Sequence, residues 1–171
     1  MGAVKKSVVG LLSVLILMGP IGSAWAEHPT TAYGPKNKRF GAGIILGDPS
    51  GLSFKGYVTQ RFAIDAIFAW SFVHDTITVG GDLLYDIMDI PVNVRAFTLP
   101  WYIGAGALVG FGTRGKNDGK TFATIRVPLG LSMQFTEYPI EVFFEIAPGL
   151  QIAPSTDVDV SGGIGVRFYF L

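Results

Sequence analysis

The chain has 171 residues, with 13 Lys and Arg against 13 Asp and Glu, and it contains no cysteine. Charged residues make up 15% of the sequence and hydrophobic residues 49%, so the charge content lies below the rough quarter that is usual in soluble domains. The neutral balance without a basic cluster argues against a nucleic-acid partner. The absence of cysteine excludes a disulfide framework, a cysteine-ligated metal and a thiol nucleophile. The length suits one domain.

The first 26 residues follow the order of a cleaved secretory signal peptide. Lys5 and Lys6 precede an apolar run over residues 8–18, and Ala24-Trp25-Ala26 supplies the small residues of a cleavage site. The apolar run is too short to span a bilayer. We therefore expect a signal peptide over residues 1–26, a flexible mature N-terminus over residues 27–39 and a single domain over residues 40–171.

From Phe40 onward, apolar residues recur at every second position, which is the period of a β-strand and not of an amphipathic helix. Turn-forming residues separate successive runs. The pattern predicts eight strands joined as hairpins, over residues 40–47, 52–58, 62–72, 77–86, 101–112, 125–135, 140–146 and 158–170. The stretch 87–100 is less regular and is predicted to be a longer connection.

The two faces of these strands differ in an unusual way. One face carries large aliphatic and aromatic residues, whereas the other carries mainly Gly, Ala and Ser with isolated charges. A soluble barrel would turn the apolar face inward, but its exterior would then need a denser polar coat than this. The reverse orientation predicts an all-β fold, an eight-stranded antiparallel up-and-down transmembrane β-barrel whose narrow interior is filled by side chains.

The isolated charges on the small-residue face are the candidate interior residues. They are Lys55, Asp65, Asp82, Arg126, Glu141, Glu145 and Arg167. Because unpaired buried charges are very unfavourable, we expect the three cations to neutralise the carboxylates in a structural network, with partners that depend on strand register. Aromatic residues near strand ends are typical of the lipid interface, and Trp70, Tyr85 and Trp101 are the candidates.

Four stretches carry a family resemblance, at residues 43–55, 126–130, 141–149 and 162–170. Through them, most of residues 40–171 resembles the small eight-stranded outer-membrane β-barrels of Gram-negative bacteria, and within that group a functionally uncharacterised family. The resemblance implies an outer-membrane location, contact with outer-membrane lipids and recognition by the outer-membrane assembly machinery. Gly165, Phe168 and Phe170 match the C-terminal signal that this machinery reads, and we expect a monomer.

Motifs for cofactor, metal or catalytic chemistry are incomplete. Residues 110–117 have the glycine and lysine spacing of a phosphate-binding loop, but Asn117 replaces the required hydroxyl residue. Residues 157–168 begin like a calcium loop, yet Phe168 stands in place of the final glutamate. Ser71, His74 and Asp75 are the local candidates for a nucleophilic triad, but Ser71 is predicted to point inward while His74 lies in a turn. We therefore assign no catalytic, cofactor-binding or metal-binding residue.

These observations favour a non-enzymatic role in envelope structure, envelope integrity or surface interaction. Three alternatives remain open: an enzyme that modifies outer-membrane lipid, a narrow channel, and a soluble periplasmic lipid-binding barrel.

Overall fold

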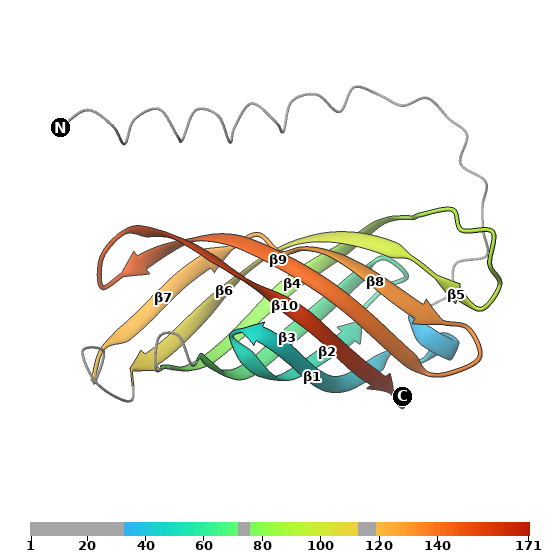
Figure 1. The fold of residues 1–171 in the computed structure, drawn as a ribbon, viewed down its shortest axis with the longest axis horizontal. Helices are drawn as coiled ribbons and strands as arrows, with labels where there is room; N and C mark the ends of the chain where they lie inside the picture. The colour runs from blue at the N-terminus through green and yellow to red at the C-terminus, as the bar shows by residue number, and fades with distance from the viewer. Residues whose placement is uncertain (1–32, 72–75, 113–118) are drawn as a thin grey trace, which may run out of the picture.

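The computed structural model describes residues 33–71, 76–112 and 119–171, and in it the strands wind around a common axis as an antiparallel β-barrel (Figure 1). A short 3-10 helix, η2 (Pro35–Asn37), precedes the strands. The strands are β1 (Phe40–Asp48), β2 (Ser50–Tyr57), β3 (Phe62–Ser71), β4 (Thr76–Asp89), β5 (Phe97–Thr98), β6 (Pro100–Gly112), β7 (Thr121–Arg126), β8 (Leu129–Phe135), β9 (Ile140–Ala153) and β10 (Asp157–Tyr169). The expected signal peptide lies outside the described residues.

The sheet closes on itself through the first and last strands. Neighbouring strands pair in the order β1, β2, β3, β4 and β6. Strands β7 and β8 both lie between β6 and β9 and together occupy one position in the barrel. Strand β9 pairs with β10, which pairs with β1 and closes the barrel. At the end of this seam the Phe40 N–H donates to the carbonyl oxygen of Leu171 (2.9 Å), and the Phe170 N–H donates to that of Phe40 (3.0 Å). The barrel therefore has eight strand positions and no open edge.

One predicted strand is divided in two by a proline. The run over residues 125–135 becomes β7 and β8, separated by Val127 and Pro128, because proline has no N–H to give to a strand ladder. The wall stays connected there, since the Val127 N–H donates to the carbonyl oxygen of Pro148 (2.9 Å) and the Gly104 N–H donates to that of Pro128 (2.8 Å).

Other limits also differ from the sequence prediction. Strands β4 and β9 extend to Asp89 and Ala153, beyond the predicted ends at residues 86 and 146. The predicted connection over 87–100 contains the short strand β5, which pairs with β8. The loop is therefore shorter than its irregular sequence suggested, because ladder hydrogen bonds continue where the apolar alternation fades.

Residues 33–39, part of the segment expected to be flexible, pack against one end of the barrel. Pro35 is fully buried, and Tyr33 lies against an aromatic cluster of the interior that includes Tyr57 and Tyr169. The guanidinium carbon of Arg39 is 3.9 Å from the centre of the Tyr33 ring. Figure 1 shows η2 at the same end as the C-terminus, so this segment covers that end of the barrel.

Burial alternates along the strands in the sense opposite to that of a soluble protein. In β3, Asp65 is 1% exposed, whereas Ile64 is 51% and Phe68 is 54% exposed. The same alternation puts Asp82 inside and Leu83 outside on β4. The barrel thus carries its large apolar side chains on the exterior and its charges in the interior. Among the described residues, no helix has the length and apolarity needed to cross a membrane.

Several glycines let adjacent strands approach closely, and Gly43 on β1 is the tightest. A Cβ atom at Gly43 would lie 1.8 Å from the carbonyl oxygen of Val166 on β10, whereas one at Gly56 on β2 would meet the Phe40 ring at an ordinary 3.5 Å.

We expect Gly43→Ala to lower the free energy of unfolding by about 1–3 kcal/mol, because the added methyl group forces the β1–β10 seam apart. Gly56→Ala is the matched control and should leave it nearly unchanged. The measurement is urea unfolding of protein folded in detergent micelles. Equal stabilities of the two variants would contradict the close approach at Gly43.

Candidate functional site

Glu141 of β9 is the acceptor at the centre of the buried charges. Its Oε1 atom lies 3.1 Å from the Nζ atom of Lys55 and also accepts a hydrogen bond from the hydroxyl of Ser132. Its Oε2 atom lies 3.2 Å from the Nη1 atom of Arg167 and accepts from the Tyr169 hydroxyl at 2.8 Å. The carboxylate is fully buried, and four donors from three strands satisfy both of its oxygens.

Arg167 of β10 links this centre to the opposite part of the wall. Its Nη2 atom forms an ion pair with Asp65 of β3, and its Nε atom donates to the hydroxyl of Ser53 at 2.9 Å. The Phe143 ring lies beneath the guanidinium, with 3.7 Å between its centre and the guanidinium carbon. A single arginine on β10 therefore reaches across the interior to β2 and β3, which are not its neighbours in the barrel and are distant in the sequence.

A second group forms around Arg126 of β7. Its Nε atom donates to Oδ1 of Asp82 at 3.0 Å, and its Nη2 atom bonds the other oxygen of the same carboxylate. The Nη2 atom also lies 3.5 Å from Oε1 of Glu145, whose Oε2 accepts from the Tyr102 hydroxyl at 2.9 Å. The two-pronged contact with Asp82 is the geometry in which arginine binds carboxylates most firmly.

All seven residues proposed for the interior network are buried, with at most 4% of each exposed, and each makes at least one ion pair with another member. The candidate interface aromatics Trp70, Tyr85 and Trp101 alternate with the buried neighbours Ala69, Leu84 and Tyr102, so they point outward. Trp70 and Trp101 lie next to the ends of β3 and β6, whereas Tyr85 lies inside β4. Of the predicted assembly signal, Gly165 faces the interior, while Phe168 and Phe170 are 53% and 42% exposed.

Three tyrosines belong to the interior network and were not among the sequence candidates. These are Tyr57, Tyr102 and Tyr169. The Tyr57 hydroxyl donates to Asp86 at 3.0 Å and accepts from the side-chain amide of Gln134 at 2.8 Å. The alternation along the strand could have identified two of them, because residues two positions apart face the same side of a sheet. Tyr57 lies two residues from Lys55, and Tyr169 lies two residues from Arg167.

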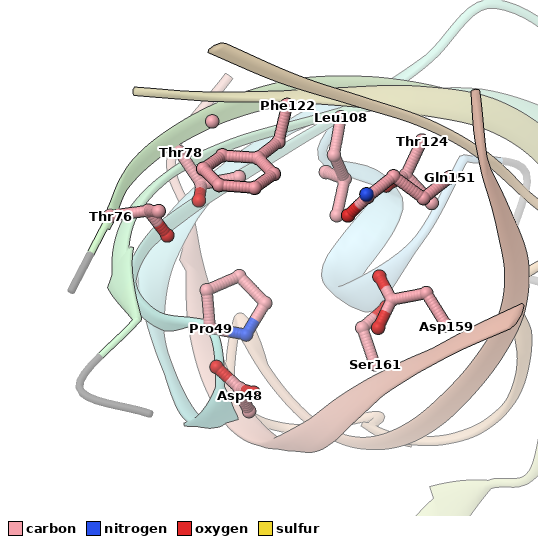
Figure 2. A pocket seen from close by; sticks show the side chains of 11 residues that line it. Asp48, Pro49, Thr76, Thr78, Leu108, Phe122, Thr124, Gln151, Asp159 and Ser161 are labelled. Carbon is pink, nitrogen blue, oxygen red and sulfur yellow. The ribbon is translucent and has the colours of Figure 1, made fainter. Parts of the chain in front are cut away.

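The other end of the barrel holds a small recess (Figure 2). Its volume is about 80 Å³, and its walls come from β1, β4, β6, β7, β9 and β10. The lining combines the hydroxyls of Thr76, Thr78 and Thr124 with the carboxylate of Asp159 and the ring of Phe122. This is the end opposite η2 and the C-terminus, where the β1–β2 and β9–β10 turns lie (Figure 1).

The remaining chemical candidates contribute little to these sites. Over residues 33–71, 76–112 and 119–171, no group of three or more His, Cys, Asp or Glu side chains could hold a metal ion. His74 and Asp75 lie outside the described residues, and Ser71 is the last residue of β3. The stretch that begins like a calcium loop, at Asp157, is part of strand β10.

Comparison with known proteins adds no relative. No protein-family model matches the chain, and neither a curated protein nor a solved structure matches it. The class of protein is therefore defined by the fold alone, a closed eight-stranded antiparallel β-barrel with charged side chains buried inside.

We expect Arg167→Met to lower the free energy of unfolding by about 3–5 kcal/mol, because it leaves Asp65 and Glu141 buried with fewer charge partners. Arg61→Met is the control: Arg61 is exposed at the barrel end, and a change within about 0.5 kcal/mol is expected there. Urea unfolding in micelles measures both. A similar small effect at the two positions would show that the Arg167 contacts contribute little to stability.

Proposed function

We propose that the protein is an integral outer-membrane β-barrel whose interior is filled by a salt-bridged network and whose role is structural, in envelope integrity or surface interaction. The observation that carries this proposal is the inverted distribution of side chains. Leu83 is 62% exposed on the outside, while Lys55 and Glu141 are 0% exposed within.

The exterior apolar surface extends over every strand position of the barrel. Exposed members, one from each position, are Ile44, Leu52, Phe68, Leu83, Ile103, Ile125, Phe144 and Ile164. Soluble monomers rarely expose contiguous apolar patches above a few hundred Å². A surface of this kind is favourable against hydrocarbon, and closure of the sheet supplies the backbone hydrogen bonds that lipid cannot provide.

The interior favours a structural role over conduction. Asp82 and Glu141 each bind cations through both carboxylate oxygens. The buried rings of Tyr102 and Phe143 lie against Lys55 and Arg167. Side chains held in this way stiffen the barrel and oppose the passage of ions. The predicted signal peptide and the terminal residues Phe168 and Phe170 agree with export and insertion.

Cell fractionation tests the location. We expect the protein in the outer-membrane fraction, resistant to extraction by osmotic shock, and migrating faster on a gel before boiling than after it, because a closed barrel keeps its compact form in detergent. Release by osmotic shock as a detergent-free soluble protein would reject the membrane location in favour of a soluble barrel. Discrete conductance in planar bilayers would instead favour the channel.

We expect Leu83→Arg to lower the free energy of unfolding in lipid vesicles by about 2–4 kcal/mol, because residue 83 lies near the middle of β4 and would place its charge near the bilayer midplane. Val158→Arg, near the end of β10, should change it by only about 0–1 kcal/mol. Unfolding in urea from vesicles gives both values. No depth dependence would argue against an apolar belt in lipid.

A further inference from the structure

The recess at the mouth of the barrel is lined by threonine hydroxyl groups from two strands. Thr76 and Thr78 of β4 and Thr124 of β7 are only 5%, 7% and 7% exposed, and all three line the recess. Figure 2 shows the Thr76 and Thr78 oxygens directed into the recess. These hydroxyls can therefore form hydrogen bonds with a molecule that enters it.

The opposite wall supplies hydrogen-bond acceptors. Asp159 of β10 directs its carboxylate toward the middle of the recess (Figure 2). Gln151 of β9 donates through its Nε2 atom to the carbonyl oxygen of Ser155 (3.2 Å), so its own side-chain carbonyl remains an acceptor at the recess. Threonine hydroxyls both donate and accept, so a ligand with hydroxyl groups matches both walls.

The recess also has apolar surfaces. The Phe122 ring and the Pro49 ring line it in Figure 2. Ligand sites typically combine such surfaces with a few polar groups that fix orientation. An aromatic ring accepts the C–H face of a pyranose, while hydroxyls at the edge of the sugar reach the threonine, carboxylate and amide groups.

From this arrangement we propose that the recess binds a neutral monosaccharide unit. The Asp48 and Asp159 carboxylates both line the recess and disfavour an anion, and the volume of about 80 Å³ suits one edge of a single sugar ring rather than a buried oligosaccharide. The threonine hydroxyls and the Gln151 amide match the hydroxyl groups of a sugar, which a simple cation does not have.

The inner end of the recess is closed by side chains. Ser161 lines the recess, accepts a hydrogen bond from Nη1 of Arg126 at 3.4 Å and donates to the carbonyl oxygen of Ala147 at 3.3 Å. The same arginine is held below by Asp82 and Glu145. The ligand is therefore retained at the mouth and not conducted through the barrel.

Ligand-observed NMR on the protein folded in detergent micelles tests this proposal, with D-glucose, D-galactose, D-mannose and N-acetyl-D-glucosamine as separate probes. We expect saturable binding of at least one sugar. Thr78→Val, which removes a hydroxyl at nearly constant shape, should weaken that binding roughly 3- to 10-fold. Asp159→Asn should weaken it roughly 10- to 100-fold, because hydrogen bonds to charged groups are stronger.

Thr121→Val is the matched control. Thr121 lies on the same strand as Thr124 but is exposed outside the recess, so its substitution should leave sugar binding unchanged. Far-ultraviolet circular dichroism and gel mobility verify that each variant is folded. Binding of none of the four sugars, or equal binding by folded Thr78→Val, Asp159→Asn and the unaltered protein, would overturn the proposal. Binding of ethanolamine in place of the sugars would also overturn it.

The methyl glycoside of the best-binding sugar distinguishes two sources of the ligand. If the glycoside binds as well as the free sugar, the recess takes a terminal unit of a surface glycan. If only the free sugar binds, the ligand is a free monosaccharide. Because the measurement uses purified protein in micelles, its result is independent of the proposed membrane location.

Discussion

The structure depends on the pairing between Glu141 and Arg167. They are cross-strand neighbours on β9 and β10, and both are buried beside the seam where the barrel closes. An isolated charge in such a place would be strongly destabilising, so each needs the other and the further partners Lys55 and Asp65. These partners come from β2 and β3, which means that the ion pairs of the network are complete only when the barrel is closed.

The need to pair buried charges explains both the low charge content of the chain and the placement of its charges inside the barrel. Its low charge content reflects an outer strand surface that is mainly apolar, while charges are paired in the interior or exposed at the barrel ends. Ordinary hydrophobic burial therefore contributes less to the interior than in a soluble domain, and directional contacts contribute more. Glycines such as Gly43 and Gly130 make room for this interior by letting strands and rings approach closely, as Tyr102 does against Gly130.

The two-residue period predicted the eight strand positions and the inward face, because parity along a strand decides which side a residue takes. Parity could not pair the charges, since Arg167 and Ser53 are 114 positions apart and meet only through register around the whole barrel. Tyrosine was ambiguous, because its ring suits lipid and its hydroxyl suits the interior, and Tyr102 is placed by its contact with Glu145. The recess was beyond sequence reasoning, as its walls come from six strand positions.

Closure between the first and last strands has a consequence for the order of folding. The hydrogen bonds between Phe40 and Leu171, like that between Arg167 and Ser53, join segments separated by more than one hundred residues. Contacts of such high separation form slowly, because the entropy of the intervening loop must be lost before they add stability. The last strand must therefore be synthesised before the barrel can close, so closure is expected to come late in folding.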